Sequence, residues 1–232
     1  MIAVIADIHG NQWALEAVLR ELDRLAPQQV VVAGDLAFGG PRPGECVELI
    51  RRRGYPAIRG NTDEWLMSPS GAPAQLVGAV AWCRARLSVE DRRFLAALPF
   101  LWRYQHPAGD VVIVHAAPWS IAETIAPDAP EPLVSRVFTE ARAPVVVYGH
   151  IHIAHVRWVA EQLLVNPGSV GLPADGDPRA SFAILALNEG RWQADLRRAL
   201  YDVESAIQAS RHSDNPEGLN WARRLEMAGL SP

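Results

Sequence analysis

The sequence predicts an α/β protein in which two mixed β-sheets pack against each other with helices on the outside, and three observations support this fold class. Short, unbroken apolar runs, such as residues 2–6 and 111–114, are typical of strands that are buried on both faces. Amphipathic helical patterns alternate with these runs up to about residue 150. Beyond His152 the pattern changes to strands joined by short turns. A chain that begins as αβ units and ends as hairpins indicates two mixed sheets.

The first two thirds of the chain alternate strands with helices. The apolar runs predict strands at residues 2–6, 30–33, 55–58, 111–114 and 145–148. Asn11 can cap a helix whose apolar stripe ends before Pro27, and Ser88 with Asp91 forms the pattern of a capping box. Further helices are predicted at residues 44–53, 72–87, 89–98 and 132–141. Gly54 is suited to end the first of these, because it has no β-carbon.

The remaining strands are predicted as members of hairpins. They are expected at residues 101–105, 154–159, 163–165, 182–187 and 192–200, with antiparallel pairing after His152. The turns at residues 106–110 and 188–190 join neighbouring strands. A helical tail that contains Gly218 begins at Asp202 or Ser205. We therefore expect a single domain of residues 1–232, with a helical C-terminal tail from about residue 202.

The composition is typical of a soluble enzyme. The 232 residues carry a net charge of −4, so the chain lacks the basic character that binding of long nucleic acids requires. No apolar stretch approaches the ~20 residues of a membrane span, and no secretory signal precedes the first strand. Cys46 and Cys83 are far apart in the sequence, and we expect two buried thiols in a cytoplasmic protein. The oligomeric state is open, a homodimer included.

Each of the first five apolar runs is followed by side chains that can bind a metal ion. The set consists of Asp7, His9, Asp35, Asn61, His115, His150 and His152. Because the carboxyl ends of neighbouring strands meet at one edge of an α/β sheet, we expect these side chains to converge there. The set contains enough carboxylate, amide and imidazole groups for two metal ions, which makes the chain a candidate enzyme.

The order and spacing of these motifs resemble the calcineurin-like metallophosphoesterase superfamily. The matching blocks are Asp7 with His9, Gly34-Asp35, Gly60-Asn61 with Asp63, His115, and Gly149-His150 with His152. Segments 166–171 and 175–179 also resemble the small prokaryotic phosphodiesterase branch, so the resemblance covers about residues 1–190. It implies a four-layer α/β/β/α sandwich of two mixed β-sheets flanked by helices, and a metal-dependent phosphoesterase.

The resemblance also implies a role for each ligand. Asp7, His9 and His152 would bind the first ion; Asn61, His115 and His150 would bind the second. Asp35 would bridge both ions, since a carboxylate has two oxygens. Two ions roughly 3.5–4 Å apart would hold a hydroxide that attacks phosphorus. Because no thiolate is present in the set, we expect two divalent transition-metal ions, Mn first, with Fe, Zn or Ni as the alternatives.

The resemblance places the catalytic residues in the same motifs and reveals one departure from the pattern. The catalytic set is Asp35, Asn61, Thr62, Asp63 and His115. Asp63 is expected to orient a neighbour by hydrogen bonding. Many family members have a histidine where this chain has Thr62, and a hydroxyl does not titrate near neutral pH. A water held by Thr62 and Asp63, or His155, would then have to protonate the leaving group.

The sequence leaves the substrate contacts open. Arg59 can contact the substrate phosphate or pair with Asp63, with the pair slightly favoured, and Asn11 can contact the phosphate or cap its helix. Three tryptophans follow ligand motifs: Trp13, Trp65 and Trp119. Trp119 in particular is a candidate for stacking on a nucleobase or aryl group, although ordinary packing is the more frequent role of a tryptophan.

The predicted function is hydrolysis of phosphodiester and activated phosphomonoester bonds by a metal-bridging hydroxide, with a small phosphoester or nucleotide-like substrate. A dinucleoside-polyphosphate or protein phosphatase of the same superfamily is the alternative among enzymes. A non-catalytic scaffold with the same fold is the alternative of another class. The ligand set discriminates between them, and all seven positions carry residues that can bind metal.

Overall fold

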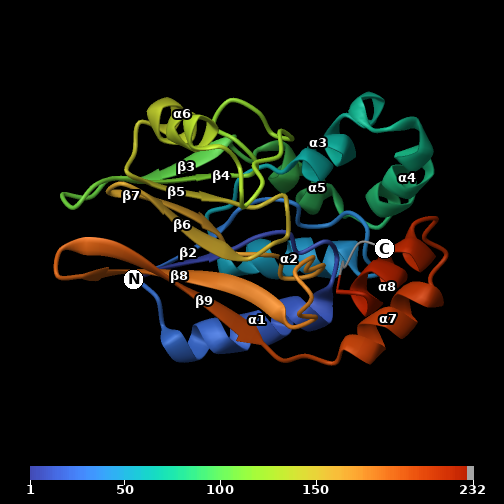
Figure 1. The fold of residues 1–232 in the computed structure, drawn as a ribbon. Helices are drawn as coiled ribbons and strands as arrows, with labels where there is room; N and C mark the ends of the chain where they lie inside the picture. The colour runs from blue at the N-terminus through green and yellow to red at the C-terminus, as the bar shows by residue number, and fades with distance from the viewer. Residues whose placement is uncertain (229–232) are drawn as a thin grey trace.

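The computed structural model describes residues 1–228 and contains two β-sheets that pack face to face (Figure 1). The first sheet has the order β2-β1-β8-β9. Its strands are β1 Ile2–Ile5, β2 Gln29–Val32, β8 Ala180–Asn188 and β9 Arg191–Ala199. Strand β1 pairs with β2 in parallel and with β8 in an antiparallel manner, so the sheet is mixed as predicted.

The second sheet has the order β3-β4-β5-β7-β6. Its strands are β3 Leu101–Tyr104, β4 Val111–Val114, β5 Val145–Tyr148, β6 His155–Val159 and β7 Gln162–Asn166. The two edge strands, β3 and β6, are antiparallel to their neighbours. Strand β7 was expected to have antiparallel neighbours only, but it also pairs in parallel with β5. The reason is that β6 turns the chain back and β7 then returns between β5 and β6.

Helices cover the outer face of each sheet and complete the four layers. Helix α1 (Gln12–Leu25) contacts β8 and β9, with α2 (Pro43–Arg53) beside it. Helix α6 (Glu131–Ala141) contacts β5 and β6 on the other side. Between the sheets lies an apolar core that includes Val4, Val31, Val147 and Val165. The α/β/β/α sandwich implied by the sequence is confirmed.

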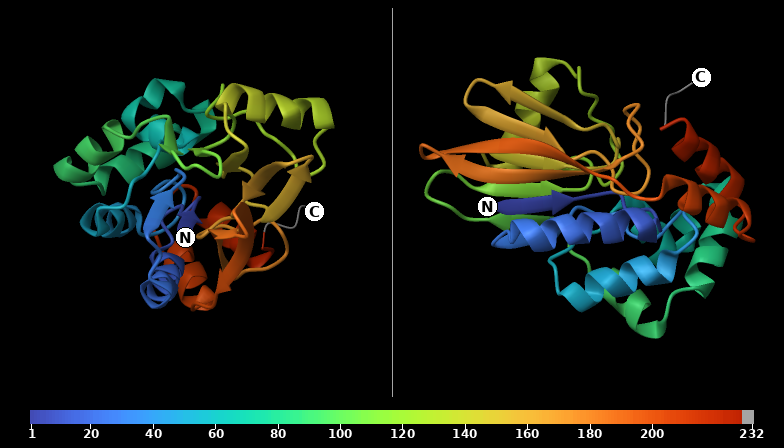
Figure 2. Two further views of the ribbon diagram at one scale, coloured as in Figure 1. Left: turned by 90° about the vertical axis from the view of Figure 1, so that its left-hand side faces the viewer. Right: turned by 90° about the horizontal axis from the view of Figure 1, so that it is seen from below.

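The remaining helices gather at one end of the sheets. They are α3 Asn61–Met67, α4 Val77–Ala85, α5 Val89–Ala96, α7 Val203–Arg211 and α8 Gly218–Glu226, with short 3₁₀ helices at Pro69–Gly71 and Ala74–Leu76. In Figure 2 the arrow of β1 points toward this end, so the helices surround the carboxyl end of β1. Within residues 1–228, no helix has the length and apolar character that crossing a membrane requires.

Local capping signals predicted the helix boundaries well. The Asn11 side chain accepts a hydrogen bond of 3.2 Å from the Ala14 amide at the start of α1. Ser88 forms the expected capping box at the start of α5, and Gly54 ends α2 with a φ of 64°. Asp202 caps α7. These signals act within one helical turn, so the surrounding fold hardly changes them.

Three predicted elements differ in the structure. Residues 55–58 form only an isolated bridge, from Ala57 to Val32, because Pro56 has no N–H with which to extend a ladder. The helix predicted at residues 72–87 is regular only from Val77, after two 3₁₀ turns. The tail is two helices, α7 and α8, and Gly218 begins the second. A β-carbon at Gly218 would lie 2.6 Å from the Ser210 carbonyl oxygen, so only glycine fits this close helix contact.

Candidate metal centre

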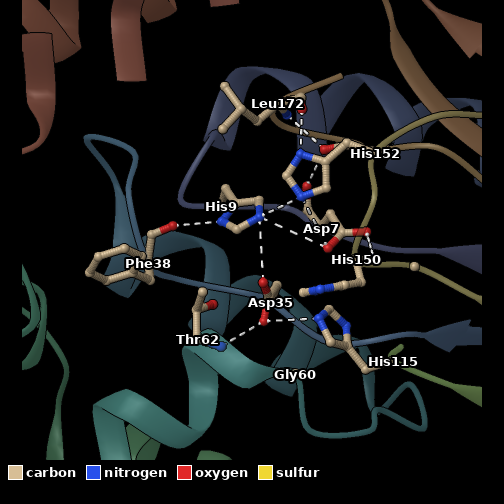
Figure 3. A network of polar contacts seen from close by, with 12 residues as sticks. Asp7, His9, Asp35, Phe38, Gly60, Thr62, His115, His150, His152 and Leu172 are labelled. Atoms are coloured by element: carbon tan, nitrogen blue, oxygen red, sulfur yellow. Dashed lines mark hydrogen bonds and ion pairs between the residues drawn. The ribbon is translucent and has the colours of Figure 1, made fainter. Parts of the chain in front are cut away.

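Six of the seven predicted ligands lie on loops that follow strands of both sheets (Figure 3). Asp7 and His9 follow β1, and Asp35 follows β2. From the second sheet, His115 follows β4 directly, and His150 and His152 follow β5. Asn61 is the first residue of α3. The two sheets thus deliver their ligands to one place, at the carboxyl ends of the strands, as the sequence indicated.

Five of these seven residues have a positive φ, a conformation that few residues other than glycine adopt. They are Asp7 (56°), His9 (48°), Asp35 (57°), His150 (70°) and His152 (60°). Backbone hydrogen bonds of 3.0 Å, from the Asp7 amide to Gly34 and from the His9 amide to Asp35, hold the first two loops in place. A residue in this backbone conformation lowers the stability of the fold by about 1–3 kcal/mol, and such residues are concentrated at functional sites. The turns also allow His150 and His152, two positions apart, to face the same site.

A first cluster consists of Asp7, His9 and His152. The Nε2 atoms of His9 and His152 lie 3.0 Å apart. Oδ1 of Asp7 lies 3.4 Å from Nε2 of His152 and 3.9 Å from Nε2 of His9. This carboxylate oxygen is buried and accepts no hydrogen bond from residues 1–228. Three ligand atoms therefore face one point, and one of them lacks any other partner, which suits a bound cation.

A second cluster centres on the amide oxygen of Asn61. Oδ1 of Asn61 lies 3.0 Å from Nε2 of His115 and 3.0 Å from Nδ1 of His150. The two imidazole rings are nearly perpendicular, with centroids 5.3 Å apart. Oxygen and imidazole donors that converge in this way suit a second divalent ion.

Asp35 lies between the two clusters. Its Oδ2 is 3.6 Å from Nε2 of His9, and its Oδ1 is 3.5 Å from Nε2 of His115. The Thr62 amide donates a hydrogen bond of 3.0 Å to Oδ1 and holds the carboxylate in this orientation. A β-carbon at Gly60 would lie 2.0 Å from the same oxygen, so glycine is required there. Each carboxylate oxygen of Asp35 thus faces a different cluster.

Backbone carbonyls orient three of the imidazole rings. The Nδ1 atoms of His9, His152 and His115 lie 2.8, 2.7 and 2.8 Å from the carbonyl oxygens of Phe38, Leu172 and Ala33, respectively. A carbonyl oxygen can only accept, so Nδ1 carries the proton and Nε2 keeps a free lone pair. His150 is the exception, because its Nδ1 faces Asn61 while its amide donates to Oδ2 of Asp7 at 2.9 Å.

Comparisons with known proteins identify the family. A model of the calcineurin-like phosphoesterase superfamily domain matches residues 1–190. The chain belongs to this superfamily. Protein MJ0912 of Methanocaldococcus jannaschii is 31% identical to this phosphoesterase over 239 residues, which cover 94% of the chain and 95% of that protein. Phosphodiesterase YfcE of Escherichia coli K12 is 28% identical over 195 residues, which cover 78% of the chain and 84% of YfcE.

A solved structure extends the likeness to the whole chain. The crystal structure of a metallophosphoesterase from Sphaerobacter thermophilus superposes with a TM-score of 0.79 at 27% identity and covers 98% of both chains. Together with YfcE, this likeness confirms the resemblance to the small prokaryotic branch. The chain is a phosphoric ester hydrolase, and its Asp and His cluster implies divalent metal ions.

The charges of the phosphoesterase site suit metal ligands. Burial raises the pKa of Asp7, but the facing His152, together with His115 and His9, lowers it to about 2. Burial and the neighbouring His152 lower the pKa of His9 to about 4. At neutral pH Asp7 is therefore an ionised carboxylate and His9 a neutral imidazole. These are the protonation states in which the two side chains can bind a metal ion.

Asp63 of the phosphoesterase contacts the backbone of the loop that carries Asp35. Its carboxylate accepts hydrogen bonds from the amides of Asp35 (2.8 Å), Leu36 (3.0 Å) and Gly60 (3.0 Å). Burial and the nearby Asp35 raise its pKa to about 7. These hydrogen bonds connect the Asp35 loop to the start of α3, and the orienting role of Asp63 in catalysis stays a prediction.

The three predicted substrate contacts interact with other protein groups, and none of them lines the cavity that contains the ligand residues. Asn11 is 0% exposed, and besides capping α1 it donates to the Gly171 carbonyl at 2.9 Å, which leaves no surface for a substrate. Arg59 pairs with Glu64 at 3.5 Å and not with Asp63 as expected. Trp119 donates to Glu123 at 2.7 Å, and its ring faces the guanidinium of Arg136 at 3.9 Å. The sequence offered helix capping for Asn11 and packing for Trp119 as alternatives to a substrate contact, but it did not indicate the pairing of Arg59 with Glu64.

A cavity of about 310 Å³ opens onto the clusters of this phosphoesterase. Thr62 lines it, and the buried Thr62 hydroxyl has no hydrogen-bond partner in residues 1–228. Trp65 also lines it and packs edge-on against Phe38, with ring centroids 5.6 Å apart. Trp13 packs against the C-terminal helices instead. His155 contacts the Tyr148 hydroxyl at 3.1 Å and is not part of the cavity wall.

Sequence reasoning missed one wall of the cavity. Four residues of the C-terminal tail form it: Glu217, Asn220, Trp221 and Arg224. They follow the last ligand motif by more than sixty positions. The amphipathic pattern of residues 218–226, with its buried Trp221, indicates only that one face of this helix packs against the rest of the protein. No local motif indicates that its partner is the metal centre.

Proposed function

We propose that this phosphoesterase hydrolyses phosphodiester bonds, and activated phosphomonoesters, with two divalent transition-metal ions. The position of Asp35 carries this proposal, since each of its carboxylate oxygens faces a separate cluster of ligand atoms. The first ion would be held by Asp7, His9 and His152, the second by Asn61, His115 and His150, with Asp35 bridging them.

The chemistry of the donor atoms supports this metal class. The donors are carboxylate, amide and imidazole groups, and both cysteines lie elsewhere in the core. Such a set suits Mn, Fe, Zn or Ni, and we propose Mn as the first candidate. The buried Oδ1 of Asp7, which accepts no hydrogen bond from residues 1–228, would gain a partner in the bound ion.

When bound, a pair of such ions lowers the pKa of water and neutralises the charge on phosphate oxygens. The residues of the chain keep this arrangement rigid. Asp63 and the carbonyls of Phe38, Leu172 and Ala33 orient the ligands. The Thr62 hydroxyl can donate a hydrogen bond to a substrate oxygen, but it does not titrate near neutral pH. Substrates with good leaving groups should therefore react fastest.

The size of the cavity supports a small substrate. At about 310 Å³ it is at the lower end of the range for ligand pockets. A small phosphoester or a nucleotide-like molecule fits this volume, and the net charge of −4 disfavours a long nucleic acid. The cytoplasmic location and the homodimer considered from the sequence stay predictions.

A substrate and metal panel tests the proposal. The purified chain, stripped of metal and reloaded in turn with Mn, Fe, Zn, Ni or Mg, would be assayed on aryl phosphodiesters, aryl and alkyl phosphomonoesters, and nucleotides. We expect fast turnover of aryl diesters and slow turnover of alkyl monoesters. Protein that binds two ions but hydrolyses none of these esters would contradict the proposal.

A further inference from the structure

Helix α8 lies beyond residues 1–190, the part that the family domain covers, yet it forms one wall of the cavity at the metal centre. In Figure 1 it lies at the same end of the sheets as α3 and α4. Two contacts hold the tail there. The Asn215 side chain donates to the Gly39 carbonyl at 2.8 Å, and Asp214 accepts from the Trp82 indole of α4 at 2.7 Å. The tail is therefore anchored to the Gly39 loop and to α4.

Trp221 is the most buried residue of this wall. It is 3% exposed, and its indole Nε1 has no hydrogen-bond partner in residues 1–228. A β-carbon at Gly39 would lie 3.2 Å from Cδ1 of Trp221 and 3.9 Å from Nδ1 of His9, so the indole packs closely against the loop that holds His9. Buried donors in proteins nearly always have an acceptor. Trp221 lines the cavity, so a ligand bound there can supply an acceptor that the protein does not.

Arg224 is the cation of this wall. It lines the cavity, and no carboxylate of residues 1–228 forms an ion pair with it. The neighbouring Glu217 accepts a hydrogen bond from Asn220 at 2.8 Å. A guanidinium that lines the same small cavity as the metal clusters is suited to pair with phosphate oxygens, because it offers two parallel donors and a fixed charge.

We propose that α8 determines the substrate of this enzyme: Arg224 binds the phosphate group, and Trp221, which lines the cavity together with Trp65, contacts a planar aromatic substituent. The substrate class is then a small anionic phosphoester that carries a nucleoside or aryl group. This inference rests on the proposed function. It assigns substrate recognition to a part of the chain that lies outside the matched family domain.

Two substrates with one leaving group test the two roles separately. The 4-nitrophenyl esters of thymidine 5′-phosphate and of methyl phosphate release the same phenolate and carry the same charge. Arg224→Gln should raise KM about tenfold for both esters, the order expected for one charge-assisted hydrogen bond, with kcat nearly unchanged. Arg223→Gln is the matched control, because Arg223 is exposed on the same helix and does not line the cavity.

Trp221→Leu should raise KM for the thymidine ester about tenfold more than for the methyl ester, the order expected when stacking on one base is lost. Trp221→Phe keeps a ring, so its effect should be smaller, and this variant decides the question if Trp221→Leu does not fold. The affinity of the metal-loaded protein for inorganic phosphate, measured by calorimetry, should fall about tenfold in Arg224→Gln and stay unchanged in the Trp221 and Arg223 variants.

The outcomes distinguish the inference from the proposed function. An active wild type whose KM is unchanged in Arg224→Gln overturns the role of Arg224. Equal effects of the Trp221 substitutions on both esters overturn aromatic recognition and leave Trp221 as a support for the His9 loop. A metal-loaded wild type that hydrolyses neither ester overturns the proposed function, and the inference with it.

Discussion

The Nε2 atoms of His9 and His152 lie 3.0 Å apart, although 143 positions separate the two residues in the sequence. His9 follows a strand of the first sheet and His152 follows a strand of the second. Both rings present a nitrogen lone pair to the same point, because their Nδ1 protons are held by carbonyl oxygens. A cation bound there would join the two sheets at their carboxyl ends.

Metal binding should therefore stabilise the fold as well as complete the site. We expect elemental analysis after reconstitution with Mn to give two ions per chain, and chelation to lower Tm measurably. If an ion binds only the folded state and its free concentration is 100 times its Kd, it adds about 2.7 kcal/mol to the free energy of unfolding. His212→Ala, an exposed position in the tail, is the control for stoichiometry. A fully active protein that contains no metal ion or only one per chain would contradict the proposal of two metal sites.

Asp35→Asn and His115→Ala should remove nearly all turnover of an aryl phosphodiester. Asp35 faces both clusters, and His115 comes directly from β4 into the second cluster. Circular dichroism should show that both variants stay folded, because neither side chain belongs to the apolar core between the sheets. Folded variants that keep most of the wild-type activity would show that the ligand assignment is wrong.

Thr62 predicts a steep dependence of rate on the pKa of the leaving group. Thr62 lines the cavity, but a hydroxyl cannot protonate an alkoxide as a histidine would. Thr62→His should flatten the dependence and raise rates on alkyl esters, up to the ~10²–10⁴-fold that general acid catalysis contributes. Thr139→His places the same residue at an exposed position and should change nothing.

His155→Ala should leave the same leaving-group dependence unaltered, because His155 contacts Tyr148 and does not line the cavity. A wild type with a flat dependence that becomes steep in His155→Ala would identify His155 as the acid after all. A flat dependence in all variants would point to a donor other than residues 62 and 155.

The ion pair of Asp177 and Arg179 should contribute to acid stability. Hydrogen bonds from the Arg179 side chain, at 3.0 Å to Oδ1 and 2.6 Å to Oδ2, lower the pKa of Asp177 from 3.8 to about 2. The folded state therefore holds its carboxylate ionised at a lower pH than the unfolded state does. The resulting stability is present above about pH 4 and is lost as the pH falls toward 2.

Arg179→Gln should return the pKa of Asp177 toward 3.8, measured by an NMR titration of the side-chain carboxyl. Stability measured by denaturation should then depend less steeply on pH between about 4 and 2. Arg197→Gln, which removes a neighbouring exposed pair with Asp195, should leave the pKa of Asp177 unchanged. A pKa of Asp177 that stays near 2 in Arg179→Gln would exclude this pair as the cause.

The sequence by itself determined the elements whose signals are local. Asn11, Gly54, Ser88 and Asp202 mark helix ends because capping involves groups within one turn of each other. The convergence of the candidate metal ligands was predictable for a related reason. A side chain that directly follows a buried strand must emerge at the carboxyl edge of its sheet, so order along the chain already indicates convergence.

Tertiary structure alone decided which side chains meet the substrate cavity. Trp119 follows a ligand motif yet packs against Arg136, whereas Trp221, far beyond the last motif, lies beside the loop of His9. Residues 55–58 are apolar yet form only a bridge, because β2 is the edge strand beside them and Pro56 cannot extend the pairing. Such contacts depend on how separate elements pack together. The free energy of this packing is summed over residues that are distant in the sequence, so no local sequence pattern predicts these contacts.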